Sequence, residues 1–218
     1  MVLCSFRAMM AGTIKADWGT LMKTSKKLTG VILRAGLALA GVGVCATALP
    51  VVVAQQAHAA LAEGEQAPDF QLKGALGGTP LTFSLKEALK KGPVVLYFFP
   101  AAFTKGCTLE AHAFAEATDN FTKQGATVVG VTAGNVDRVA EFSKDECRSK
   151  FAVLADPGGK VATLYKSLSS QGSFVHSDRI SYVIAPDGKV VLSYVSQDPE
   201  THVSKTLETV TKLHNATH

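Results

Sequence analysis

Two apolar runs with a helical pattern between them constrain the fold of this chain more than any other feature of its sequence. The first run, PVVLYFF, spans Pro93 to Phe99, and the second, ATVVGVT, spans Ala126 to Thr132. Continuous runs of this length, rich in β-branched and aromatic residues, are typical of strands covered on both faces. Residues 105–124 between them have a helical pattern that ends at Gly125. The order strand, helix, strand predicts parallel strands joined by a helix.

The segments around this unit continue the alternation. Upstream, residues 80–83 could be a short strand, and Ser84 with Glu87 has the spacing of a capping box at a helix start. Downstream, Asn135 can cap a helix that continues to about Arg148. The run FAVLAD at 151–156 then predicts a third strand, and a PGG turn leads into a short helix near Tyr165.

The last third of the chain has a different pattern. Residues 179–195 contain two apolar segments around Pro186-Asp187-Gly188, which is typical of a hairpin. Residues 199–214 predict a final amphipathic helix. Parallel strands joined by helices and followed by an antiparallel pair indicate the α/β class, with a thioredoxin-like fold in which helices flank a central mixed sheet.

The N-terminal region has the pattern of a secretory signal. Residues 22–34 are basic, residues 35–54 carry no charge, and Ala57-His58-Ala59 is a small-residue cleavage site. We therefore expect residues 22–59 to be a signal peptide, residues 1–21 an upstream extension and residues 60–218 the folded domain. The expected location is outside the cytoplasm, most simply the periplasm. The uncharged run is also long enough to remain as a membrane anchor if it is not cleaved.

Removal of this region changes the charge. The whole chain has 22 basic and 18 acidic residues, a formal net charge of +4. Six of the basic residues and one of the acidic residues precede Ala60, so the remainder has a net charge of −1. The basic balance therefore belongs to the targeting segment, and the sequence indicates no nucleic-acid partner.

Two cysteines remain after residue 59, Cys107 and Cys147. In an exported protein such a pair commonly forms a structural disulfide. The surroundings of Cys107 indicate a reactive thiol instead, because it falls in the first turn of the helix at 105–124, where free amides and the helix dipole favour a thiolate. Thr104 can donate its hydroxyl toward the sulfur, and Lys105 adds positive potential. The absence of a Cys-x-x-Cys motif excludes dithiol exchange within the motif.

The pattern Pro100-x-x-x-Thr104-x-x-Cys107 resembles the active-site motif of peroxiredoxins. GCTLEAHAF is similar to the peroxiredoxin Q, or bacterioferritin comigratory protein, branch of that family. APDFQL, VVGVT, ADPGGKVATLY and DRISYVIAPDGKV follow in the order that this branch has. The resemblance covers nearly all of residues 60–218.

The resemblance implies a role for several residues. Cys107 is the expected peroxidatic cysteine, which a peroxide oxidises to a sulfenic acid. Pro100 and Thr104 would shape its pocket. Arg179 matches the family arginine that stabilises the thiolate and the charge that develops on the peroxide. Glu110 matches a family glutamate.

One position departs from the branch. Many members have a resolving cysteine five residues after the peroxidatic one, where this chain has His112. The other arrangement in the branch places the resolving cysteine in the next helix, which suits Cys147 near the end of the predicted 135–148 helix. A one-cysteine mechanism resolved by an external thiol stays open.

The expected function is a thiol peroxidase that reduces hydrogen peroxide and organic hydroperoxides. The alternative is a non-catalytic thioredoxin-fold binding domain with a Cys107–Cys147 staple. The expected partners are the peroxide and a thioredoxin-like or small-thiol reductant, and the expected state is a monomer or weak dimer. No cofactor or metal is expected, because the histidines lack ligand spacing and no Gly-rich phosphate loop is present.

Overall fold

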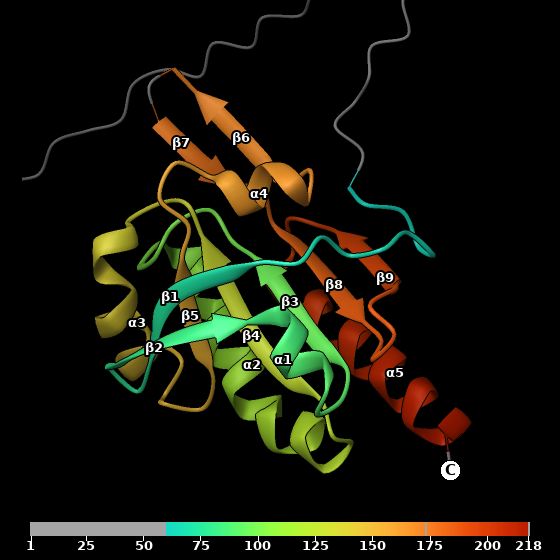
Figure 1. The fold of residues 1–218 in the computed structure, drawn as a ribbon. Coiled ribbons are helices and arrows are strands. Elements are labelled where there is room, and N and C mark those ends of the chain that lie inside the picture. Colours follow the sequence, from blue (N-terminus) through green and yellow to red (C-terminus); the bar gives the residue numbers. More distant parts are fainter. Residues whose placement is uncertain (1–59, 173, 218) are drawn as a thin grey trace, which may run out of the picture. The chain divides into compact units, whose positions relative to one another are not determined.

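A seven-stranded mixed sheet forms the centre of the computed structural model, which describes residues 60–172 and 174–217 (Figure 1). The predicted extension at 1–21 and signal peptide at 22–59 lie outside the described residues. The strand order is β2-β1-β5-β4-β3-β8-β9. The strands are β1 Gln71–Leu76, β2 Thr79–Ser84, β3 Val94–Phe98, β4 Thr127–Thr132, β5 Ala152–Ala155, β8 Ile180–Ile184 and β9 Val190–Val195.

The three strands predicted from apolar runs lie at the centre of this sheet. β3 pairs with β4, and β4 with β5, in parallel, whereas β8 pairs antiparallel with β3 and with β9. Every residue of β3 is buried, as its uninterrupted apolar run predicts. The expected mixed sheet flanked by helices is therefore confirmed.

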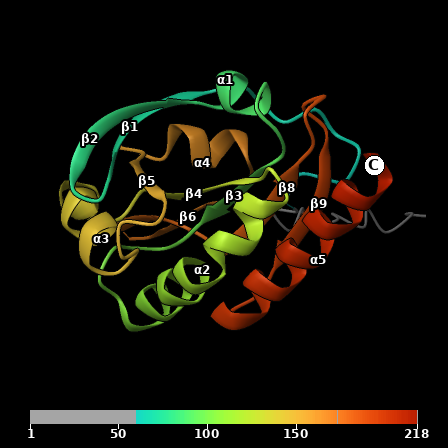
Figure 2. The same cartoon turned by 90° about the horizontal axis from the view of Figure 1, so that it is seen from below.

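Helices cover both faces of the sheet (Figure 2). One face carries α2 Lys105–Lys123, α3 Val139–Asp145 and α5 Pro199–Thr217, and the other carries α1 Leu85–Leu89 and α4 Lys160–Leu164. Successive side chains of β3 point to opposite faces of the sheet, so the core consists of two clusters, one on each face. Val95 and Tyr97 pack among side chains of α2, α3 and α5, whereas Leu96 packs among those of α1 and α4. Both Cys107 and Cys147 belong to the cluster on the face that α2, α3 and α5 cover.

Local signals explain several element ends. The Ser84 side chain accepts a hydrogen bond from the Glu87 amide at 3.4 Å, as the capping box predicts. Gly188 turns the β8–β9 hairpin with a φ of 85°, a conformation that suits glycine. The final helix begins at Pro199, as expected, and continues to Thr217.

The predicted 135–148 helix is wrong in its bounds. The segment divides into a short 3-10 turn, Val136–Arg138, and α3, which ends at Asp145. Asn135 has a left-handed φ of 52° and makes no side-chain cap. Its side-chain amide donates to the Ala102 carbonyl instead. Cys147 consequently lies just beyond the helix, in a turn whose next two residues, Arg148 and Ser149, have positive φ.

Three further strands escaped the sequence analysis. Strand β1 contains Gly74, which weakens a strand pattern, yet a Cβ atom there would lie 2.1 Å from the Val153 carbonyl of β5. Only glycine permits this close approach of the two strands. Strands β6, Leu168–Gln171, and β7, Phe174–Ser177, form a separate antiparallel pair. Within the described residues, no helix has both the length and the apolar character needed to cross a membrane.

Candidate active site

Cys107 lies in the first turn of α2, behind the turn that follows β3. Thr104 is the N-cap of α2 in an extended conformation, and the preceding Phe103 has a φ of 63°. A positive φ is uncommon for a residue with a side chain and persists where the surroundings impose it. The Cys107 side chain is 1% exposed and its sulfur is a free thiol. The first-turn amides of α2 have no intrahelical partners, so this end of the helix favours negative charge.

Arg179 reaches this sulfur from the segment between β7 and β8. Its Nη2 donates to Cys107 Sγ at 3.6 Å, and its Nη1 donates to Glu110 Oε2. Burial lowers the pKa of Arg179, but the negative charges of Glu110 and Cys107 outweigh burial and raise it. The guanidinium therefore stays protonated and offers a charge-assisted hydrogen bond to an anionic sulfur.

Glu110 is completely buried one turn further along α2. Burial raises the pKa of its carboxyl from 4.5 to about 8, although Arg179 acts in the opposite direction. The second oxygen, Oε1, has no hydrogen-bond partner among the described residues. It lies 3.9 Å from Nδ1 of His202 on α5. The site thus places one permanent cation between two groups that can each become an anion.

His202 is a residue of this region that the sequence analysis missed. Its Nε2 lies 3.0 Å from the Ser196 carbonyl, which can only accept, so Nε2 carries a proton. In the neutral ring Nδ1 is then an acceptor for the Ser181 hydroxyl, 2.8 Å away. Burial lowers the pKa of His202, which favours this neutral form. A lone histidine in an amphipathic helix carries no local signal of such an environment.

Thr104 and Pro100 stand beside the sulfur in sequence but make other contacts. The Thr104 hydroxyl donates to the Ala101 carbonyl at 3.1 Å, so the expected contact with the Cys107 sulfur is not made in this structure. The Pro100 carbonyl accepts from the Thr132 hydroxyl at 3.3 Å, which ties the turn to the end of β4. Thr104 as a residue is exposed, so rotation of its side chain would turn the hydroxyl from the Ala101 carbonyl toward a bound molecule.

Cys147 is fully buried and is also a free thiol. Burial, and then the charge of Glu146, raise the pKa of this thiol well above its ordinary value. A neutral buried thiol is a poor nucleophile, so Cys147 is unreactive in this conformation. Burial, and after it the neighbouring ionisable groups Cys147, Glu110 and Cys107, raise the pKa of the Tyr97 phenol well above its ordinary value.

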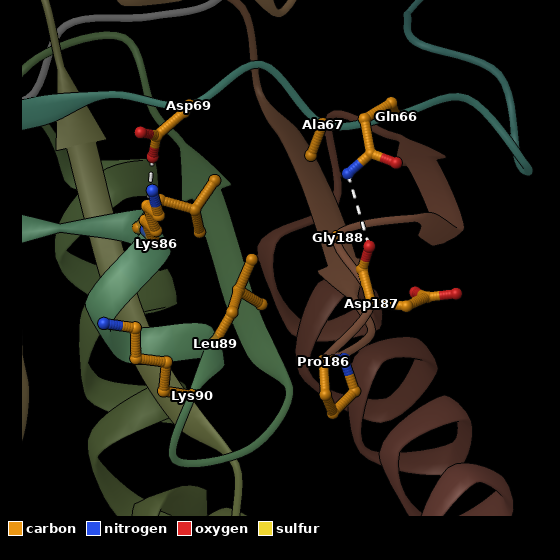
Figure 3. A pocket seen from close by; sticks show the side chains of 10 residues that line it. Gln66, Ala67, Asp69, Lys86, Leu89, Lys90, Pro186, Asp187 and Gly188 are labelled. Atoms are coloured by element: carbon orange, nitrogen blue, oxygen red, sulfur yellow. Dashed lines mark hydrogen bonds between the residues drawn. The ribbon is translucent and has the colours of Figure 1, made fainter.

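A surface pocket of about 460 Å³ lies elsewhere, between residues 66–69, α1 and the β8–β9 turn (Figure 3). Its walls include Asp69, which accepts from the Lys86 amide, and Gln66, which donates to the Asp187 carbonyl. None of the five predicted site residues lines it. Within the described part of the chain, no group of three or more His, Cys, Asp or Glu side chains is placed to hold a metal ion.

Comparison with known proteins places this geometry in context. Residues 64–193 match the AhpC/TSA family. The chloroplastic peroxiredoxin Q of Sedum lineare is 35% identical over 156 residues, which are 71% of this chain and 81% of the plant protein. The crystal structure of peroxidoxin BcpB from Mycobacterium tuberculosis has a TM-score of 0.64 and 31% identity, and the match covers 69% of this chain and 97% of that one. AhpC from the same organism, at 21% identity and a TM-score of 0.61, shares the fold.

Proposed function

The chain belongs to the AhpC/TSA family and is a peroxiredoxin, and on this premise we propose that Cys107 is its peroxidatic cysteine and that hydrogen peroxide and organic hydroperoxides are its substrates. The observation that carries the proposal is the Arg179 contact with the Cys107 sulfur at 3.6 Å. A permanent cation beside a cysteine at a helix N-terminus stabilises a thiolate, which is the reactive form.

The first step follows from this charge arrangement. The Cys107 thiolate attacks the terminal oxygen of the hydroperoxide, so an S–O bond forms as the O–O bond breaks. The other oxygen leaves with the electron pair, takes a proton from water and departs as water or an alcohol. Arg179 and the first-turn amides of α2 face the charge that develops on the oxygens. Thr104 would turn its hydroxyl from the Ala101 carbonyl to the peroxide.

Cys147 is the proposed resolving cysteine. Its thiolate attacks the sulfur of the Cys107 sulfenic acid, an S–S bond forms, and the hydroxyl group leaves as water after protonation. A thioredoxin-like dithiol or a small thiol then reduces the disulfide with two electrons. Because Cys147 is buried and neutral, the turn that carries it has to open before this step.

Mass spectrometry after one equivalent of peroxide tests both roles. Cys107→Ser is expected to abolish peroxide consumption while the domain stays folded. Cys147→Ser is expected to form the sulfenic acid at the wild-type rate, to over-oxidise more readily and to require added small thiols for turnover. Full turnover by Cys107→Ser would refute the assignment of the peroxidatic cysteine. Wild-type protein with Cys147 still free after oxidation would refute only its resolving role.

We also propose that the protein is exported and acts outside the cytoplasm. The support is the basic, apolar and Ala57-His58-Ala59 pattern of the N-terminal region. Intact-mass measurement of the exported protein should give an N-terminus at Ala60. A mass that retains residues 35–59 would indicate a membrane anchor instead.

A further inference from the structure

Three pairs of oppositely charged side chains join α2 to the turn that carries Cys147. His112 Nε2 lies 2.8 Å from Glu146 Oε2, an ion pair when the imidazole is protonated. Arg148 Nη1 lies 3.1 Å from Glu116 Oε1, and Lys150 Nζ lies 3.1 Å from Asp119 Oδ1. We call these three pairs the α2 ladder.

The arrangement of the α2 ladder encloses Cys147. Its α2 members are four and three residues apart, so they lie on one face of the helix. Their partners alternate along the turn at 146, 148 and 150, and Cys147 stands between the first two. Between these charged side chains the Cys147 side chain is buried in the core that also holds Cys107. The ladder thus lies on the solvent side of the turn, and the Cys147 thiol lies on its buried side.

The turn itself is in a conformation that its residues do not favour. Arg148 and Ser149 are consecutive residues with left-handed φ values of 48° and 57°. Such values are unfavourable for residues with a side chain and persist where the surroundings impose them. The Ser149 amide donates to the Ser143 carbonyl, and the Lys150 amide donates to the Cys147 carbonyl. Backbone hydrogen bonds within the turn and to α3 therefore hold it closed, together with the ion pairs that the ladder makes to α2.

We propose that the α2 ladder is a latch that sets the rate at which Cys147 leaves the core to form the disulfide with Cys107. This inference rests on the proposed resolving role of Cys147. The ladder residues are positioning residues, because they act by holding the turn that carries Cys147 rather than by taking part in the bond exchange. A tighter latch prolongs the life of the Cys107 sulfenic acid, and a looser latch shortens it. The latch thereby divides the sulfenic acid between disulfide formation and over-oxidation by a second peroxide.

Charge reversal across the ladder tests the proposal. Arg148→Glu and, separately, Lys150→Asp each replace one attraction by a repulsion without changing the sulfur site. After one equivalent of peroxide, quench-flow mass spectrometry should show sulfenic acid formation at the wild-type rate and disulfide formation roughly two- to fivefold faster, as expected for one exposed pair. The swaps Glu116→Arg with Arg148→Glu, and Asp119→Lys with Lys150→Asp, should restore the wild-type rate of disulfide formation.

Lys212→Glu is the matched control. It reverses one charge of the exposed Lys212–Glu208 pair on α5, in which Nζ lies 2.7 Å from Oε1, and should leave both rates unchanged. Raising the ionic strength should shrink the difference between Arg148→Glu and wild type, because salt screens exposed charges.

The outcomes separate the latch from the resolving role. Single reversals that leave the rate of disulfide formation unchanged, or swaps that fail to restore it, would overturn the latch while the resolving role stands. The absence of a Cys107–Cys147 disulfide in wild type and in every variant would overturn the resolving role, and the latch with it.

Discussion

The guanidinium of Arg179 lies 3.6 Å from the sulfur of Cys107, although 72 positions separate the two residues in the chain. The same guanidinium also holds the Glu110 carboxyl, so the sulfur and the carboxyl depend on one planar fork of donors. The fold brings this fork to the first turn of α2 from the segment that leads into β8, which is antiparallel to β3. The positioning of the site therefore depends on the sheet rather than on the local motif.

Arg179→Lys should separate charge from geometry. A lysine keeps the positive charge but has no fork with which to reach the sulfur and Glu110 together. We expect the rate constant of Cys107 oxidation to fall by about 10²- to 10³-fold, the usual effect of removing one donor to a developing anion. Quench-flow mass spectrometry measures it, with Lys212→Arg at an exposed position of α5 as control. A rate within twofold of wild type would contradict this role.

Gly106→Ala should disturb the same contact more gently. A Cβ atom on Gly106 would lie 3.0 Å from Nη2 of Arg179, so the guanidinium has to shift by a few tenths of an ångström. Oxidation of Cys107 should slow severalfold. Stability should be unchanged or slightly higher, because alanine is a better helix former than glycine. In an Arg179→Lys background the substitution should have little further effect; an undiminished effect there would show that it acts by another route.

The sequence predicted those features that depend on neighbouring residues. The apolar runs predicted β3, β4 and β5, the capping box predicted the start of α1, and the turn residues predicted the β8–β9 hairpin. The motif around Cys107 predicted its place in the first turn of α2. Each of these depends on local propensity or periodicity, which a single sequence carries directly.

Other features depend on contacts between distant segments and left no local signal. Position 74 of β1 has to be glycine because the strand lies against the Val153 carbonyl of β5, and this glycine weakens the strand pattern in the sequence. α3 ends before Cys147 because the chain turns through Arg148 and Ser149 in left-handed conformations, which their residue types do not predict. His202 joins the site only through the packing of α5 against the sheet.

Tyr97→Phe should stabilise the protein. The Tyr97 ring stacks on Phe114 with centroids 4.5 Å apart, but its buried hydroxyl has no hydrogen-bond partner among the described residues. Phenylalanine keeps the stacking and removes an unsatisfied polar group, whose burial costs about 1–3 kcal/mol. Denaturant unfolding of the reduced protein should show a free energy of unfolding about 1 kcal/mol higher.

Tyr182→Phe is the matched control for that change. The Tyr182 hydroxyl donates to the Tyr165 carbonyl at 2.7 Å, so its removal should lower the free energy of unfolding by about 1 kcal/mol. A loss of similar size in Tyr97→Phe would show that the Tyr97 hydroxyl has a partner, such as a water molecule shared with one of the two thiols.

Glu110→Gln should change how stability depends on pH. Burial raises the Glu110 pKa from 4.5 to about 8 in the folded state, while Arg179 opposes the shift. Between these two values the folded protein keeps a proton that the unfolded chain has released. The contribution of Glu110 is therefore fully present below about pH 4.5 and is lost as pH rises toward 8, with a slope of at most about 1.4 kcal/mol per pH unit.

The measurement is the free energy of unfolding from pH 5 to 9 in a Cys107→Ser background, which removes the neighbouring thiol. His202 contributes a slope of the opposite sign, because burial lowers its pKa and its stabilisation is lost as pH falls below about 6.5. Both proteins retain His202, so the difference between their curves reports chiefly on the Glu110 carboxyl. The exposed Glu63→Gln is the control and should match the parent at every pH. Parallel curves for the Glu110→Gln variant and its parent would mean that Arg179 keeps Glu110 ionised throughout this range.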